Sequence, residues 1–199
     1  MLNFYPKKSN KNPAISSLSS EGFTLIEVIT ITIILGILAG VAAPSWLGFL
    51  QNQRLSNARN EVLQAMRSAQ NRARAEKTTW QVSIRENSDT VEWAVHPAGV
   101  SISSVSSWES LNSDIKVFTS KNQQDKCETT FNKSGSNCPS SPWSIQFDDK
   151  GLPSSLGQFT LTTQNSNKPK SCIYVSTVLG AMRTGTYHEL PNNSDKNCY

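Results

Sequence analysis

The segment Ser19–Gly40, SSEGFTLIEVITITIILGILAG, places a carboxylate, Glu27, almost at the start of a long apolar run. No residue from Val28 to Ala43 is charged, and most of these side chains are Ile, Leu, Val or Ala, which suits a helix in lipid. A charged side chain in hydrocarbon costs roughly 2.5–3.5 kcal/mol at the helix centre and less toward the helix end. Glu27 therefore requires a partner or a position near the lipid headgroups.

Length and composition indicate one folded domain with an appendage. The chain has 199 residues, of which 37% are hydrophobic and 17% charged, values that are ordinary for a globular protein. The formal net charge is +4, and about half of it lies before Phe23, where Lys7, Lys8 and Lys11 outnumber Glu21. The bulk charge therefore gives no strong indication of nucleic-acid binding.

The N-terminal segment differs in order from a secretory signal peptide, which has a basic region, an apolar core and then a cleavage site of small residues. Here the three lysines precede a polar stretch, then Gly22, and only then the apolar run. Cleavage at Gly22 would leave the apolar segment on the mature protein. This order and the motif GFTLIEV resemble the precursors of type IV pilins and of type II secretion pseudopilins.

The resemblance implies a leader peptide over residues 1–22. In that family a membrane aspartyl peptidase, the prepilin peptidase, cuts after the glycine and methylates the new N-terminal residue, which here is Phe23. Glu27 is then expected to act in assembly, because its carboxylate would pair with the free amine of a neighbouring subunit inside the packed helices. The alternative, which position alone permits, is that Glu27 reaches the headgroups from the helix end.

Small residues and a proline follow within the apolar run. Gly36 and Gly40 form a Gly-x-x-x-Gly pattern, which lets helices approach closely in lipid, although glycine is frequent in membrane helices generally. Pro44 removes an amide donor and can kink or open a helix, and pilin-like proteins commonly carry a proline at this place. We expect residues 23–50 to form a transmembrane and assembly segment.

Past Pro44 the pattern becomes amphipathic. Apolar residues recur at spacings of three and four, at Leu55, Ala58, Val62, Ala65, Met66, Ala69 and Ala73. Arginines fall largely between them, which is more typical of a solvated helix face than of a nucleic-acid stripe. One helix is therefore predicted from about Thr24 to about Lys77, with its first half in the membrane and its second half, 51–77, packed on a domain.

From Trp80 onward the period changes to two and β-forming residues dominate. Strands are predicted at TWQVSI, VEWAV, DIKVF, WSIQF, QFTLTT and SCIYVST, separated by turn-rich pieces such as HPAGVSISS and DDKGLPSSLG. The fold class predicted is α+β and pilin-like, with a long N-terminal helix packed on an antiparallel sheet. The globular domain would cover residues 51–199, with its β part at 80–199.

Three further segments resemble the GspH/FimT branch of the family. LQAMRSAQNRARAEKTTWQVSI, FDDKGLPS and SCIYVSTVLGAMRTG are similar to its helix end, its Asp-x-x-Gly turn and its C-terminal strand–Gly–Arg hairpin. The resemblance implies a minor pilin acting in assembly, initiation or at the tip of a type IV pilus, with roles in motility or natural competence. A GspH-type minor pseudopilin of type II secretion and a DNA-binding FimT-like pilin are the alternatives. The chain departs from the branch by its added tail, TYHELPNNSDKNCY.

The four cysteines all follow the apolar run, so they would lie in an oxidising compartment. No Cys-x-x-Cys sequence is present and the chain has only two histidines, which disfavours a metal site. Three disulfide connectivities are possible. We favour Cys127–Cys138, which closes the loop CETTFNKSGSNC, and Cys172–Cys198, which staples the tail to the last strand.

Catalytic motifs are lacking, since the sequence contains no Gly-x-Ser-x-Gly, phosphate-binding loop or His-Glu-x-x-His. We expect the chain to be a peptidase substrate and not an enzyme, without a cofactor. DNA capture is not favoured, because the candidate contacts Lys168, Lys170 and Arg183 are few for phosphate binding, and DNA-binding FimT proteins carry a more basic segment than GAMRTG.

The partners expected are the prepilin peptidase, other pilins or pseudopilins in the filament, the inner-membrane assembly platform and the membrane itself. We expect a single pass through the inner membrane, with the C-terminal domain in the periplasm or outside, followed by a place on the cell surface in a pilus. Both the pilus and the type II secretion interpretations stay open.

Overall fold

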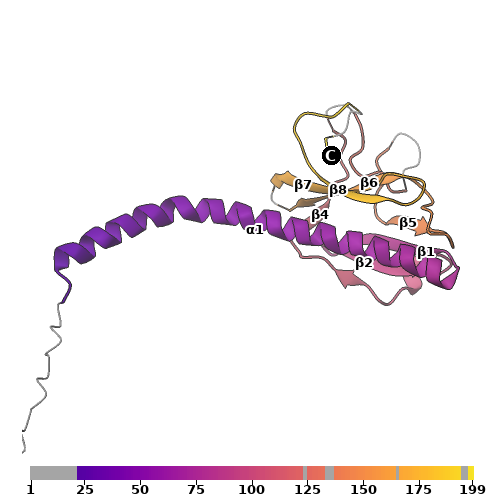
Figure 1. Cartoon of the computed structure of the whole chain (residues 1–199), viewed down its shortest axis with the longest axis horizontal. Helices are drawn as coiled ribbons and strands as arrows, with labels where there is room; N and C mark the ends of the chain where they lie inside the picture. The colour runs from indigo at the N-terminus through magenta and orange to yellow at the C-terminus, as the bar shows by residue number, and fades with distance from the viewer. Residues whose placement is uncertain (1–21, 123–124, 133–136, 165, 194–196) are drawn as a thin grey trace, which may run out of the picture. The chain divides into compact units, whose positions relative to one another are not determined.

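The computed structural model describes residues 22–122, 125–132, 137–164, 166–193 and 197–199, and the side chains of all of these except 41–45 and 166–168 (Figure 1). Apart from Gly22, the predicted leader lies outside the described residues. Contacts divide the chain into two units, one ending at Pro44 and one running from Ser45 to Tyr199, and each is described by itself.

A single helix, α1, runs from Leu25 to Glu76. It begins after Thr24, whose carbonyl and hydroxyl oxygens both accept a hydrogen bond from the backbone N–H of Glu27, at 3.1 and 3.4 Å. Thr24 at the N-cap and Glu27 three residues later form the sequence pattern of a capping box. The helix is followed by Lys77 with φ of 55°, the left-handed conformation that ends many helices. The predicted long helix is confirmed.

The second unit contains two four-stranded sheets in which all paired strands are antiparallel. The first sheet has the order β3-β2-β1-β5, made of β1 Trp80–Asn87, β2 Thr90–Pro97, β3 Glu109–Ser110 and β5 Trp143–Phe147. The second has the order β4-β6-β7-β8, made of β4 Ile115–Val117, β6 Gly157–Thr163, β7 Ser166–Val175 and β8 Met182–Thr186. A short 3-10 helix, η1, covers Ile102–Ser104. The α+β architecture is confirmed.

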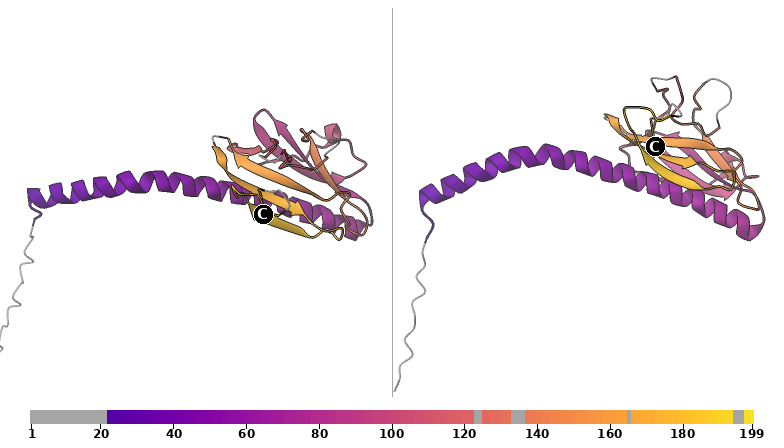
Figure 2. Two further views of the ribbon diagram at one scale, coloured as in Figure 1. Left: turned by 90° about the horizontal axis from the view of Figure 1, so that it is seen from above. Right: turned by 45° about the horizontal axis from the view of Figure 1, so that its top comes forward.

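The core of the second unit lies between α1 and the sheets, and Figure 2 shows the second half of the helix lying along them. The helix buries the apolar stripe predicted from its sequence, and each member is at most 3% exposed: Leu55, Ala58, Val62, Ala65, Met66, Ala69 and Ala73. Alternate strand residues meet this stripe, for example Val82 and Ile84 from β1 and Ile173 from β7. Four alanines in the stripe leave room for larger strand side chains to pack closely on the helix.

The six strands predicted from the sequence are present with shifted ends. Two short strands, β3 and β8, lack the apolar alternation that reveals a strand, because β3 has two exposed residues and β8 buries only Gly185. The hairpin implied by the family resemblance contains β8, which pairs with β7 from Val175↔Met182 to Ser171↔Thr186.

Two glycine turns are fixed to α1 by one side chain. Gln70 is 9% exposed, and its Nε2 donates hydrogen bonds to the carbonyl oxygens of Gly151, at 2.8 Å, and Gly180, at 3.2 Å. Both glycines have φ near +77°, and a Cβ at either position would collide with a helix side chain, Arg74 or Gln70. Gly151 of the Asp-x-x-Gly turn and Gly180 of the C-terminal hairpin therefore both contact the helix.

Met66 is the largest fully buried side chain of α1. We expect Met66→Ala to lower the free energy of unfolding by about 2–5 kcal/mol, because it removes buried methylene groups and leaves a cavity. Urea denaturation of the full chain in detergent micelles, followed by tryptophan fluorescence, measures the change. Arg67→Ala, on the exposed side of the same helix turn, should stay within about 0.5 kcal/mol, and equal effects of the two variants would contradict the packing described.

Candidate assembly surface and the disulfide-stapled face

The first unit exposes an apolar surface along the start of α1. Every large apolar side chain from Phe23 to Leu38 is between 44% and 78% exposed, and none of the described side chains of this unit is buried. Water is a poor environment for so much contiguous apolar area, which marks a surface that another molecule or lipid covers. This is the candidate assembly surface.

The threonine hydroxyls within the apolar run donate hydrogen bonds to carbonyl oxygens of the same helix. The hydroxyl of Thr30 donates to the carbonyl oxygen of Ile26 at 2.8 Å, and that of Thr32 donates to Ile29 at 2.9 Å. Such bonds remove the cost of placing a hydroxyl in an apolar environment. The two threonines are therefore compatible with a buried or lipid-facing helix.

The predicted glycine positions lie on open helix surface. A Cβ added at Gly36 or Gly40 would meet no atom within 4 Å, so nothing in the described chain requires glycine there. α1 continues through Pro44, whose side chain lies outside the described side chains. The expected roles of Gly36, Gly40 and Pro44 in helix packing stay predictions.

Glu27 lies in the first turn of α1, where its negative charge also interacts favourably with the helix dipole. Its side chain is exposed, and no ion pair involving Glu27 occurs among the residues that the structure describes. Stabilisation of the helix start is thus a second role for this carboxylate. In the sequence this role is indicated by the Thr-x-x-Glu spacing of Thr24 and Glu27.

Within the described part of the chain, no helix is both long enough and apolar enough to cross a membrane.

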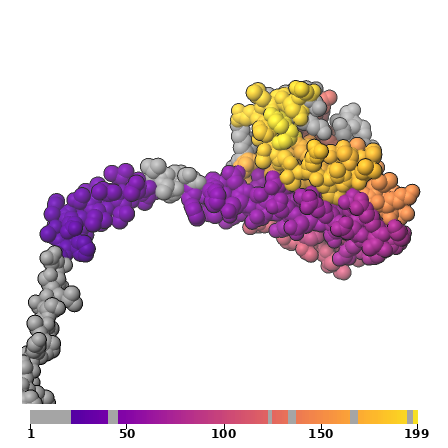
Figure 3. Space-filling model, in the orientation of Figure 1, coloured from indigo at the N-terminus to yellow at the C-terminus, as the bar shows by residue number. Residues whose placement is uncertain are grey.

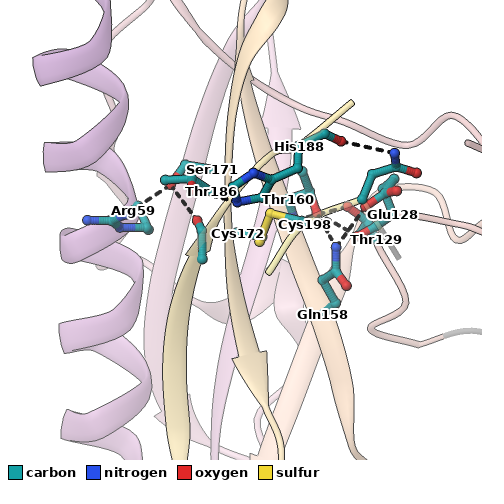
Figure 4. The surroundings of a disulfide bond; sticks show 12 residues. Arg59, Glu128, Thr129, Gln158, Thr160, Ser171, Cys172, Thr186, His188 and Cys198 are labelled. Carbon is teal, nitrogen blue, oxygen red and sulfur yellow. Dashed lines mark hydrogen bonds between the residues drawn. A yellow bond between two sulfur atoms is a disulfide. The ribbon is translucent and has the colours of Figure 1, made fainter. Parts of the chain in front are cut away.

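In the second unit the two expected disulfides are present. Cys127 is joined to Cys138 and Cys172 to Cys198, and within the described residues no cysteine is free. Figure 4 shows the second disulfide at the centre of a polar neighbourhood, with Arg59 of α1 donating to the hydroxyl of Ser171 at 3.2 Å. Cys172 and Cys198 are completely buried.

The tail residues 197–199 form an extra edge beside β8. Thr186 and Tyr199 exchange backbone hydrogen bonds, both of 3.1 Å, and the N–H of His188 donates to the carbonyl of Asn197 at 2.6 Å. The rings of His188 and Tyr199 stack with centroids 4.0 Å apart. Figure 3 shows the C-terminal part of the chain, in yellow, on the surface of this unit. The tail, which the Cys172–Cys198 disulfide staples to β7, therefore covers the backbone edge that β8 would otherwise expose.

A buried polar cluster lies next to the staple. The carboxylate of Glu128 is 2% exposed and accepts a hydrogen bond from Gln158 Nε2 at 2.9 Å, while the Thr160 hydroxyl donates to the Glu128 carbonyl at 2.6 Å. Burial, and to a smaller extent the carboxylate of Glu128, raises the pKa of Tyr174 to about 12. The cluster fixes the loop that carries Cys127. Among the described residues no group of three or more metal-ligating side chains occurs.

Of the candidate DNA contacts, Lys170 and Arg183 lie apart on the β7–β8 hairpin. Lys170 is 9% exposed and its ammonium lies over the rings of Phe118 and Tyr187, at 3.6 and 4.2 Å. Arg183 is exposed, and in the strand register it lies opposite Tyr174 of β7. Tyr174 is four residues from Lys170 along β7, so the backbones at Arg183 and Lys170 are separated by roughly 13 Å along the strand. The side chain of Lys168 lies outside the described side chains.

No protein-family model matches this chain, and no curated protein matches it. Among solved structures, it is similar to the type IV minor pilin FimU of Pseudomonas aeruginosa strain PAO1. The similarity has a TM-score of 0.42 and 12% sequence identity, and covers 68% of this chain and 90% of that chain.

The staple gives a testable stability difference. Replacing Cys172 and Cys198 by serine should lower the free energy of unfolding by about 2–5 kcal/mol and should accelerate amide hydrogen exchange at Thr186, because the tail is no longer held beside it. Denaturation and residue-resolved exchange of the full chain measure both. The matched variant without Cys127 and Cys138 should leave exchange at Thr186 unchanged, and slow exchange in both variants would show that the tail binds without its staple.

Proposed function

We propose that the chain is a structural subunit of a filament of the type IV pilin kind, cleaved after Gly22 and methylated at Phe23. The observation that carries the proposal is the division of α1 into two patterns. Its first part is apolar and exposed throughout, whereas its second part buries a single stripe in a disulfide-stapled domain. The first part of such a helix can associate with other subunits, and its second part carries a separate folded domain that the filament can expose.

The apolar segment would have two successive environments. Before assembly, residues 23–50 would lie in the inner membrane, with the domain on the far side, where the disulfides form. In the filament the same side chains would pack against the corresponding helices of other pilins. Gly36 and Gly40 would allow close approach, since no atom of the described residues lies within 4 Å of a Cβ placed at either position. The prepilin peptidase and the inner-membrane assembly platform are the further partners this pathway requires.

Glu27 would pair with the methylated amine of Phe23 in an adjacent subunit. An unpaired charge in a packed apolar bundle is costly, and a partner of opposite charge offsets that cost. Glutamine serves equally well in a capping box, and the helix dipole favours a charge at this position by only about 0.3–1 kcal/mol, less than the cost of leaving a buried charge unpaired. Substitution by glutamine therefore separates the two roles.

Within this function we favour a minor pilin of a type IV pilus, acting in assembly, initiation or at the tip, with a GspH-type pseudopilin of type II secretion as the alternative. DNA capture is less favoured, because Lys170 is engaged with two aromatic rings and is distant from Arg183 along the hairpin.

The proposal is tested by Glu27→Gln in the native host. Loss of the interfacial ion pair costs about 3–5 kcal/mol when its partner stays buried, so incorporation into sheared filaments should fall at least roughly tenfold. Amounts in the membrane should be unchanged, because the variant keeps the capping pattern. Quantitative immunoblots of filament and membrane fractions give the ratio.

Glu76→Gln is the matched control, with the same chemical change at the far end of the same helix. It should enter filaments normally. Normal incorporation of Glu27→Gln would refute the ion pair and favour the headgroup or capping role.

A further inference from the structure

One edge of the first sheet is open beside a groove. The N–H of Ala98 donates to the carbonyl of Thr79 at 2.9 Å, which extends the β1–β2 ladder and fixes its alternation. Even-numbered residues of β2 therefore bond to β1, and odd-numbered ones face the opposite edge. Of the latter, Val91 accepts a hydrogen bond from Leu111 at 2.8 Å and Trp93 pairs with Glu109. The next member of the series, Val95, has no backbone partner on this edge among the described residues.

The pairing of β2 with β3 ends at Trp93. In the register of β3, Ser107 would lie opposite Val95, but the two are not paired. Trp108 follows Ser107 in the chain, and its ring lies 3.9 Å from the guanidinium of Arg85. Its indole nitrogen donates a hydrogen bond to the carbonyl oxygen of Val105 at 2.8 Å. These contacts hold the Trp108 ring on the face of the sheet that carries Arg85, while Ser107 lines the groove beside α1 without pairing with Val95.

The space beside this edge is a groove of about 690 Å³ between β2 and α1. Its walls include Glu61, Ala65, Ser68, Arg72, Val95 and Glu109. From Glu61 to Arg72 the groove follows α1 for roughly 16 Å, which matches about five residues of extended chain. Small side chains, Ala65 and Ser68, face the edge in the middle of this length.

The groove is charged with opposite signs at its two ends. Glu109 pairs with Trp93, and neither Glu109 nor Glu61 makes an ion pair within the described residues. At the other end the guanidinium of Arg72 lies 5.0 Å from the ring of Trp80, which pairs with Pro97. An extended occupant would therefore be recognised by the order of its charges as well as by its backbone.

We propose that the groove binds an extended segment of a partner protein, which adds to β2 at Val95, beyond the end of β3, and leaves the sheet before Trp93, where Glu109 is already paired. The residue opposite Val95 would exchange backbone hydrogen bonds with it and place a small or β-branched side chain over Ala65 and Ser68. A lysine or arginine would lie near Glu61 and Glu109, and an aspartate or glutamate near Arg72. This binding does not depend on the filament proposal, since it requires only the folded second unit.

The probe is the peptide acetyl-ETVTK-amide, which in the antiparallel direction has its glutamate toward Arg72 and its lysine toward Glu61 and Glu109. It is added to the full chain in detergent micelles and followed by NMR. The expected result is a saturable shift of the Val95 amide resonance. The same peptide with an N-methylated central valine should bind at least roughly tenfold more weakly, because it loses the donor to the Val95 carbonyl. No saturable shift up to roughly 10 mM, a concentration that would fill even a millimolar site, would overturn the proposal.

Charge is tested on the protein side. Glu61→Gln/Glu109→Gln should raise the Kd of the peptide roughly three- to tenfold, as expected for exposed charges, and the effect should shrink in high salt. Glu76→Gln, an acid outside the groove, should leave the Kd unchanged. Equal binding of the N-methylated peptide, or shifts that map away from β2, would identify another mode of binding and refute the strand addition.

Discussion

Burial of the α1 stripe from Leu55 to Ala73 is the contact on which the rest of the second unit depends. It fixes the rotation of the helix, and this rotation places Gln70 beneath the two glycine turns and Arg59 beside the hydroxyl of Ser171. Through these contacts the helix sets the position of the β7–β8 hairpin. The hairpin in turn carries Cys172, and with it the stapled tail.

The backbone of α1 is helical throughout, but the distribution of apolar side chains around its axis differs between the first unit and the second. In the first unit apolar side chains occupy every direction around the axis, which suits a helix surrounded by lipid or by other helices. From Leu55 to Ala73 the buried apolar side chains form one stripe, and Arg67, Arg72 and Arg74 lie on the exposed side of the helix. The proposed function follows from this change, since the first pattern has no internal partner and the second has a complete one.

The periodicity of apolar residues predicted most of this fold. The features that it did not predict depend on strand pairing and on individual side-chain contacts. The spacing of Leu55, Val62 and Met66 revealed the buried stripe, and alternation revealed six strands. Alternation did not reveal β8, which only the family resemblance implied, because its place in the sheet comes from pairing with β7 and not from apolar side chains. The open edge at Val95 could not be predicted, because no pattern in the sequence shows that the pairing of β2 with β3 ends at Trp93. At Glu27 the sequence contained the capping pattern, but position alone did not separate capping from assembly.

We propose that the exposed apolar part of α1 is the N-terminal segment of the mature protein. Mass spectrometry of the chain purified from membranes of the native host tests this proposal. We expect the chain to begin with N-methylated Phe23, and replacement of Gly22 by a bulky residue to leave the longer precursor. A native chain that still begins at Met1, or one cleaved beyond Gly40 so that the apolar run is lost, would contradict it.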